Sequence, residues 1–321
     1  MRKIVVFLIF AAVLILIGFL GNNIYSRVLN NKSSVVSPVP DFLTILVNKE
    51  VSTLNLWLPS LKNKLSANLK TPEISAQSAL IFDITTKEVL YSKNPTEKLP
   101  MASLTKIMTA IVALENKKKD DTYVVSKDDL VGEDSMGLSV EEKLSLSELL
   151  YGMMLHSGND AAEVLANNFP GGRAAFVNAM NNRVKALGLS DTSFTNQTGL
   201  EGDGKQYTTV YDVVVMTEYA LVNFPLFDQV VSTFDYNIPQ TDTHKAFYLE
   251  NETNLLTSYP GVKGVKDGYT PEAGLCLVTY LDYGGHKIVG VVLGSDDRRG
   301  EMIELLDYSL KSLGITPPPH G

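Results

Sequence analysis

Apolar and polar residues recur at regular spacings from Ser78 onward, and these spacings predict the elements of a folded domain. Two short apolar runs, 78–84 and 88–91, flank polar residues and predict a β-hairpin. Helical spacing predicts helices at 103–115, 147–155, 160–168, 173–187, 209–221 and 300–313. β-rich runs predict further strands at 245–249, 264–269, 274–281 and 287–294. Because strands at both ends of this region enclose the helices, we expect one domain in which a sheet packs against helices.

The first residues differ from the rest of the chain. Arg2 and Lys3 precede an uncharged run over 4–20, which has the length of a short membrane span or a long signal-peptide core. No clear Ala-x-Ala site follows, so we expect residues 1–21 to form a transmembrane helix, with a cleaved signal segment as the alternative. The positive N-terminus would stay inside, which places the rest of the chain outside the cytoplasm, on the cell membrane or secreted after cleavage. We expect a stalk over 22–74, a folded domain over 75–315 and a tail over 316–321.

Composition argues against several kinds of site. The formal net charge is −8 and no basic patch with interleaved aromatic residues occurs, so we expect no nucleic-acid binding. Cys276 is the one cysteine, which excludes an internal disulfide, and its apolar neighbours predict a buried core residue. The histidines are scattered, and we expect neither a metal site nor a cofactor.

The strongest chemical signal is the pair Ser103 and Lys106 at the start of a predicted helix. Residues three positions apart lie on one helix face, so their side chains can meet. A serine hydroxyl needs a base to become a nucleophile, and a lysine shielded from water near other cations can be neutral enough to act as one. The N–H groups of the helix N-terminus could stabilise an oxyanion.

Two other stretches place polar groups where an apolar pattern stops. The first contains Ser157 and Asn159, which by themselves would indicate a turn with a helix cap. The second contains Lys266, Asp267 and Gly268 within a predicted strand. A glycine there allows a ligand backbone to approach closely, although an edge strand or bulge is the simpler explanation.

In this order, the three stretches resemble the Ser-x-x-Lys, Ser-x-Asn and Lys-Thr-Gly motifs of the penicillin-recognising serine enzymes. The resemblance is closest to the low-molecular-mass D-alanyl-D-alanine carboxypeptidases and extends from about residue 79 to residue 313. It includes the segments 79–83, 100–110, 149–152, 196–200, 254–256 and 305–308. It implies an α/β fold of the α+β type, similar to that of β-lactamases and DD-peptidases, with an antiparallel β-sheet flanked by helices.

The resemblance also implies catalytic roles. Ser103 would be the acylated nucleophile and Lys106 its base. Ser157, held by Lys106 and Lys266, would pass a proton to the leaving amine. The backbone N–H groups of Ser103 and Tyr269 would form the oxyanion hole.

Other residues are implied to bind substrate. Asn159 would hydrogen-bond the substrate amide and help to orient the base, and Gly268 would allow the substrate backbone to approach closely. Lys266 would supply positive potential for the substrate carboxylate. Arg298, with Arg299 as an alternative, would meet that carboxylate with a planar fork of N–H groups.

One position departs from the family pattern. Asp267 stands where these enzymes have threonine, and an ionised aspartate can only accept hydrogen bonds and repels a carboxylate. We expect it to be turned away, to be neutralised by Lys266 and an arginine, or to weaken carboxylate recognition.

The resemblance thus implies a serine-type carboxypeptidase that removes the terminal D-alanine from peptidoglycan stem peptides and is acylated by β-lactam antibiotics. The alternatives are a DD-endopeptidase, a β-lactamase, or a weakly active or inactive wall-binding protein. The absence of a well-placed glutamate in the downstream loop argues against a class A β-lactamase. Glu163, on the predicted helix after Asn159, is interpreted as a helix-surface residue, and His156 as structural.

Overall fold

The computed structural model describes residues 69–253 and 255–320. The predicted membrane segment 1–21 and nearly all of the stalk lie outside these ranges. Within them, no single helix is long and apolar enough to cross a membrane. One sharply bent pair of helices, Val210–Asn223 with Pro225–Val231, has the length and apolar composition of a membrane span when the two are taken together.

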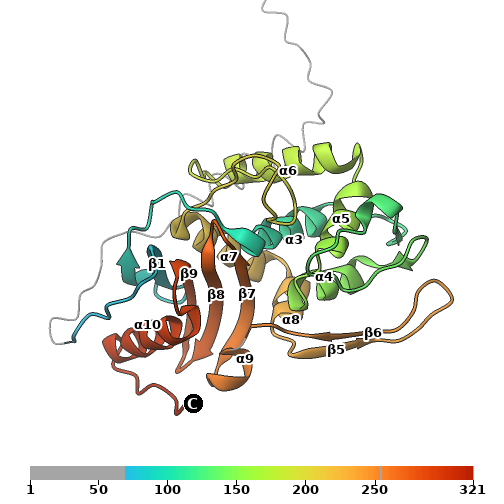
Figure 1. Cartoon of the computed structure of the whole chain (residues 1–321). Helices are drawn as coiled ribbons and strands as arrows, with labels where there is room; N and C mark the ends of the chain where they lie inside the picture. Colours follow the sequence, from blue (N-terminus) through green and yellow to red (C-terminus); the bar gives the residue numbers. More distant parts are fainter. Residues whose placement is uncertain (1–68, 254, 321) are drawn as a thin grey trace, which may run out of the picture. The chain divides into compact units, whose positions relative to one another are not determined.

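A five-stranded antiparallel sheet forms the centre of the fold (Figure 1). The predicted hairpin forms its first two strands, and the β-rich C-terminal runs form the other three in the order β2-β1-β9-β8-β7. Strand β1 pairs with β9, which joins residues about 200 positions apart, as Ala79 with Val292. The strands are β1 Ser78–Asp83, β2 Glu88–Lys93, β7 Val262–Thr270, β8 Gly274–Tyr283 and β9 His286–Ser295. The antiparallel sheet flanked by helices is therefore confirmed.

Both faces of this sheet are covered, which explains why its strands are almost continuously apolar. Along β9, Val289 and Val291 point to one face and Ile288 and Val292 to the other, as the period of two requires. The first face packs on the main group of helices, including α7 Val210–Asn223. The second packs mainly on the C-terminal helix α10 Arg298–Ser312 (Figure 1). Leu255, from the short helix before β7, joins the buried cluster on this face. Cys276 is fully buried in β8, as its apolar neighbours predicted.

The helices agree with the predicted ones to within a few residues. Helix α4 Leu146–Leu155 begins one residue earlier than expected, because Ser145 caps it by accepting from the Glu148 N–H while the Glu148 side chain accepts from the Ser145 N–H. The remaining helices are the 3₁₀ turns η1 Ala102–Leu104 and η2 Lys127–Asp129, and the α-helices α3 Thr105–Glu115, α5 Asn159–Asn167, α6 Gly172–Ala186, α8 Pro225–Val231 and α9 Leu255–Ser258.

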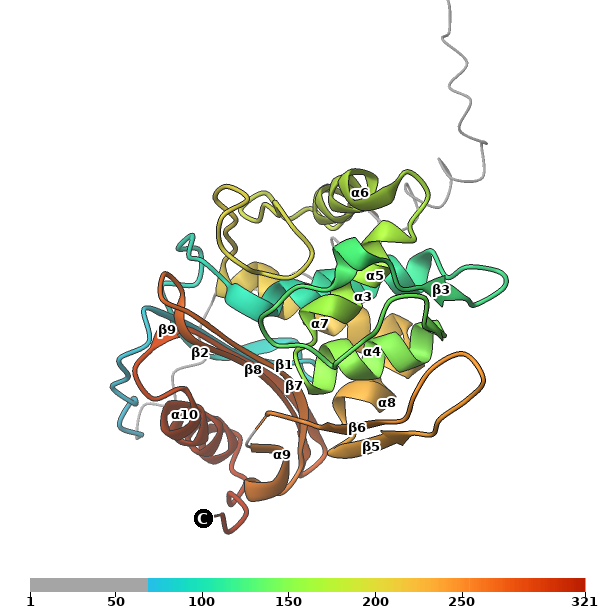
Figure 2. The ribbon, with the colours of Figure 1, turned by 45° about the vertical axis from the view of Figure 1, so that its right-hand side comes forward.

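A second hairpin was only half predicted. Strand β6 Phe247–Glu250 matches the expected strand, whereas its partner β5 Asp235–Ile238 and the preceding helix α8 were not anticipated. Three of the four residues of β5 are polar or partly exposed, so they show no clear apolar alternation. Pairing with β6 and stacking of Tyr236 on Tyr151, with ring centroids 3.6 Å apart, stabilise β5 instead. The β5–β6 hairpin lies beside α8 (Figure 2). A separate short antiparallel pair joins β3 Tyr123–Val124 to β4 Lys143–Leu144.

Candidate active site

Ser103 lies in the 3₁₀ turn η1, immediately before α3 and beside the edge strand β7. The preceding residue, Ala102, has φ = 46°, in the left-handed region that non-glycine residues rarely adopt. Ser157 has φ = 55° in the turn between α4 and α5. Two of the seven described non-glycine residues with positive φ therefore lie at the predicted site, where a strained backbone commonly aims reactive groups.

Lys106 is completely buried and has three partners arranged around its side-chain nitrogen. Its Nζ atom lies 2.9 Å from Ser103 Oγ, 2.7 Å from Asn159 Oδ1 and 2.9 Å from the Thr198 carbonyl oxygen. The amide and carbonyl oxygens can only accept, so each takes an N–H from the lysine. A neutral amine has two N–H groups and one lone pair, and its lone pair then faces the Ser103 hydroxyl. The arrangement thus suits proton transfer from Ser103 to Lys106.

The surroundings of Lys106 favour the neutral amine. Burial, together with the positive charge of Lys266, lowers its pKa from 10.5 to about 7. A substantial fraction of Lys106 is therefore unprotonated near neutral pH, as a general base requires.

The turn between α4 and α5 supplies the second motif. The Ser157 hydroxyl donates to Ser103 Oγ over 3.2 Å. Asn159 opens α5, and while its Oδ1 holds Lys106, its Nδ2 donates to the Glu133 carbonyl over 2.7 Å. The structure thus brings Ser157 and Asn159 to the nucleophile, as predicted.

The loop 196–206 provides a partner of Lys106 that was not predicted from the sequence. Its Thr198 carbonyl accepts from Lys106, and the neighbouring Gln197 carbonyl accepts from Thr109 on the same helix over 2.7 Å. Gly199 follows with φ = 94°, and a Cβ there would lie 2.0 Å from the Ala102 carbonyl oxygen. Only glycine allows this close approach to the start of η1. The segment 196–200 belonged to the resemblance, but its chemical role depends on a backbone oxygen, which no residue type encodes.

Strand β7 closes the other side of the site. A Cβ on Gly268 would lie 2.9 Å from the Ser103 nitrogen and 3.1 Å from the Ala102 Cβ. The close approach brings the backbone of β7 to the N–H of Ser103, where the second oxyanion donor, the Tyr269 N–H, was expected. Tyr269 itself is 62% exposed.

Lys266 lies in β7 with its side chain almost fully buried, but its contact differs from the expected one. Its Nζ donates to Asp267 Oδ1 over 2.9 Å, and within the described residues it forms no hydrogen bond with Ser157. Ser157 is held by Ser103 instead. The Lys106 amine also bonds to other groups, Ser103, Asn159 and Thr198. The expectation that Lys106 and Lys266 hold Ser157 is therefore wrong.

Asp267 is neutralised rather than turned away, which resolves the question that its position raised. Its Oδ2 lies 2.6 Å from Arg298 Nη2, while Oδ1 accepts from Lys266. Arg298 reaches β7 because it is the first residue of α10. Asp297 caps this helix by accepting a hydrogen bond from the Gly300 N–H. Burial alone would raise the pKa of Asp267, but the two cations outweigh it and hold the pKa below its usual range. Asp267 is therefore ionised.

Glu163 is not a helix-surface residue. Its side chain is 1% exposed and pairs with Arg173 Nη2 of α6 over 2.8 Å. Arg173 also lies 3.4 Å from Gln197 Oε1, so the pair packs behind the loop 196–206. The prediction failed because α5 is covered on the side that its polar residues indicated to be solvent-facing. His156 is partly exposed, with its Nδ1 atom 3.8 Å from Glu252.

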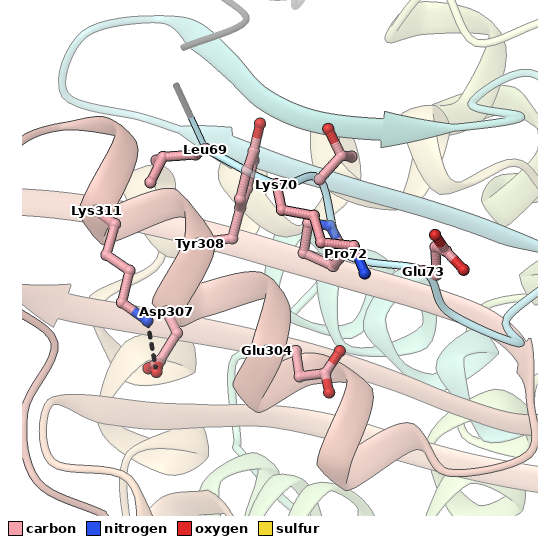
Figure 3. A pocket seen from close by; sticks show the side chains of 9 residues that line it. Leu69, Lys70, Pro72, Glu73, Glu304, Asp307, Tyr308 and Lys311 are labelled. Carbon is pink, nitrogen blue, oxygen red and sulfur yellow. Dashed lines mark hydrogen bonds and ion pairs between the residues drawn. The ribbon is translucent and has the colours of Figure 1, made fainter. Parts of the chain in front are cut away.

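A separate pocket lies between residues 69–73 and α10 (Figure 3). It is lined by charged side chains of both signs, including the ion pair of Lys311 with Asp307 at 3.4 Å. None of the predicted site residues lines it.

Comparisons with known proteins identify the family of this chain. The family model of peptidase S11, D-alanyl-D-alanine carboxypeptidase, matches residues 65–297. The chain is 34% identical over 260 residues to the D-alanyl-D-alanine carboxypeptidase DacF of Bacillus subtilis, with 77% of this chain and 66% of that protein covered. It is 31% identical over 261 residues to the D-alanyl-D-alanine endopeptidase of Escherichia coli, with 77% and 79% covered. The crystal structure of the Streptomyces K15 DD-transpeptidase matches with a TM-score of 0.71 at 32% identity, covering 76% of this chain and 100% of that one.

The fold and the pair of Ser103 with a buried Lys106 define a serine enzyme of the DD-peptidase class. Within that class, the chain belongs to the D-alanyl-D-alanine carboxypeptidase family. It spans only 60% to 66% of the length of several of the carboxypeptidases that it matches.

Proposed function

We propose that this protein is a serine-type D-alanyl-D-alanine carboxypeptidase that removes the terminal D-alanine from peptidoglycan stem peptides. The main support for this proposal is the environment of Lys106. Asn159 Oδ1 and the Thr198 carbonyl oxygen accept from its Nζ, so that the lone pair of the neutral amine faces the Ser103 hydroxyl. A catalytically silent wall-binding protein would have no need of a buried lysine with a lowered pKa at this position.

In the acylation step, Lys106 takes the proton of the Ser103 hydroxyl while Oγ attacks the carbonyl carbon of the penultimate D-alanine. The negative charge that develops on the carbonyl oxygen is stabilised by the N–H groups of Ser103 and Tyr269. When the C–N bond breaks, the Ser157 hydroxyl, which lies 3.2 Å from Ser103 Oγ, donates a proton to the leaving nitrogen. The Lys106 ammonium restores that proton, and D-alanine leaves as the free amino acid.

Hydrolysis then regenerates the enzyme. A water molecule takes the place of the leaving amine and gives its proton to Lys106 as its oxygen attacks the ester carbon. The ester bond breaks, Ser103 recovers its proton, and the shortened peptide leaves with a new carboxylate. β-Lactams would acylate Ser103 by the same attack, because their ring amide presents an equivalent carbonyl.

An endopeptidase that cuts D-alanine cross-links is the second candidate, because the endopeptidase of Escherichia coli matches 77% of this chain, the same share as DacF does. The chemistry would be the same, and only the leaving residue would differ. We further propose that residues 1–21 anchor the protein in the cell membrane with the catalytic domain outside the cytoplasm.

The test of the main proposal uses the purified protein and two substrates, an acylated tripeptide ending in D-Ala–D-Ala and a cross-linked muropeptide dimer. Release of D-alanine from the tripeptide supports a carboxypeptidase, and conversion of the dimer to monomers without D-alanine release supports an endopeptidase. Hydrolysis of neither, together with no acylation by a β-lactam, would contradict both.

A further inference from the structure

The subsite expected to bind the substrate's carboxylate already holds a carboxylate of the protein. Asp267 lies in the same strand as Lys266 and binds it through Oδ1, while Oδ2 binds Arg298 at 2.6 Å. The second terminal nitrogen of the Arg298 fork, Nη1, donates to the Gly268 carbonyl over 2.8 Å. Both ends of the fork that would clamp a carboxylate are thus engaged by the protein itself.

Lys266, Asp267 and Arg298 form a cluster whose net charge differs from the charge that it would have with threonine at position 267. Lys266 and Arg298 carry two positive charges, and ionised Asp267 cancels one of them. A threonine in its place would leave both and would add a hydroxyl that donates to a carboxylate. The aspartate instead supplies only acceptors, so a substrate carboxylate meets weaker attraction and a direct electrostatic repulsion.

The cluster still offers donors and acceptors side by side. Each oxygen of Asp267 accepts one hydrogen bond within the protein and retains a second lone pair. Its side chain is 10% exposed and that of Arg298 is 22% exposed, so both can be reached from solvent. A primary carboxamide has the complementary pattern, because its NH₂ can donate to Asp267 while its carbonyl accepts from a neighbouring cation. A cationic group would face the remaining positive charge.

We propose that Asp267 is a specificity-determining residue that shifts the enzyme toward peptides whose leaving residue carries a neutral carboxamide in place of a free carboxylate. The proposal rests on the proposed function, since it concerns the leaving residue of the same acyl-transfer reaction. The substrate class is a stem peptide in which the residue after the scissile D-alanine bond is a D-amino acid amide.

The test compares two acylated tripeptides that differ only at the C-terminus, one ending in D-Ala–D-Ala and one in D-Ala–D-alaninamide. The rates of release of D-alanine and D-alaninamide give the ratio of kcat/KM for amide over acid in one enzyme preparation, so partly folded protein does not affect it. In the wild type we expect a ratio of one or more. Asp267→Thr should raise kcat/KM for the acid at least tenfold, mainly through KM, and lower the ratio by at least the same factor.

Two further variants make the test sharper. Asp267→Asn keeps the shape and one acceptor but gains donors, so its ratio should lie between those of the wild type and Asp267→Thr. Asp282→Thr makes the same chemical change on β8, where the aspartate pairs with Lys263 at 3.3 Å, and should leave the ratio unchanged.

The outcomes separate this proposal from the one on which it rests. Cleavage of neither peptide would contradict the carboxypeptidase function itself. Cleavage of the acid with a ratio that is the same in the wild type and in Asp267→Thr would overturn the role of Asp267 while the proposed function stands. A lower kcat/KM for the acid in Asp267→Thr would overturn the role of Asp267 as well, since it would show that the aspartate assists carboxylate binding.

Discussion

Lys106 shows what a motif can predict at the scale of single residues and what it cannot. The spacing of Ser103 and Lys106 was enough to predict that the two side chains meet, because a helix fixes the geometry of residues three positions apart. The Thr198 carbonyl that completes the set around Nζ was not predictable, since it depends on how a distant loop packs. Asp267 was only partly predictable. The sequence showed that it differs from the threonine of the family motif, whereas its contacts with Lys266 and Arg298 required the structure.

The pH dependence of acylation follows from the state of Lys106. Only the neutral amine can accept the Ser103 proton, and the pKa of Lys106 is about 7. The rate of acylation by a β-lactam should therefore fall as pH drops below about 7, by about tenfold per pH unit well below that value, and level off above it. Stopped-flow measurement between pH 5 and 9 gives the profile. A rate independent of pH over this range would contradict a lysine base.

Removing the amine tests the same base directly. Lys106→Ala should slow acylation by about a hundredfold or more while initial binding persists, as expected for a lost general base. Lys119→Ala, which removes an exposed lysine just beyond α3, is the matched control and should acylate at the wild-type rate. Equal rates in the two variants would show that Lys106 is not the base.

At the scale of elements, packing accounts for the predictions that failed. Glu163 looked solvent-facing on α5, but α6 and the loop 196–206 cover it and Arg173 reaches it from α6. Strand β5 lacked apolar alternation and depends on its partner β6. The start of α4, in contrast, was predicted to within one residue from helical spacing, although the cap, Ser145, was not identified. Local signals therefore fixed where elements lie, and non-local contacts decided which faces are buried.

The buried Glu163 makes a prediction about stability. Burial raises its pKa from 4.5 to about 7, although Arg173 lowers it in part. Because the folded state binds this proton more tightly than the unfolded chain, ionisation of Glu163 costs stability as pH rises from about 4.5 to about 7, and the full cost remains above pH 7. Glu163→Gln should thus raise Tm at pH 8 by about 2 °C or more and change it little at pH 4. Thermal unfolding of the wild type and of Glu163→Gln at both pH values measures the difference in Tm, with Glu304→Gln, a substitution at an exposed residue, as the control. A Tm of Glu163→Gln below that of the wild type at pH 8 would refute the prediction.

At the scale of the whole molecule, the sheet explains how motifs far apart in sequence form one site. Strand β7 brings Lys266 and Gly268 to the start of α3, more than 150 residues earlier in the chain, and α10 carries Arg298 across to the same strand. The family resemblance anticipated this arrangement, because three motifs in a fixed order specify a known fold. Residue spacing alone could not have placed β7 beside Ser103, since strand order depends on pairing between distant segments.

The attachment of this molecule to the membrane is a separate prediction. Full-length protein should sediment with membranes and be digested by protease added outside the cell, because the run 4–20 is apolar and follows two positive residues. A protein lacking residues 1–21 and expressed in the cytoplasm should remain in the soluble fraction. Detection of a mature protein that starts after about residue 25 and is free in the medium would show instead that the segment is cleaved.

Labelling with a fluorescent penicillin, followed by peptide mapping, determines whether Ser103 becomes acylated. We expect one label per molecule of wild-type protein, on the peptide that contains Ser103, and no label on Ser103→Ala. Thermal unfolding of this variant should match that of the wild type, because only one hydroxyl is lost. Undiminished labelling of folded Ser103→Ala, or a label on any other residue of the wild type, would contradict acylation at Ser103.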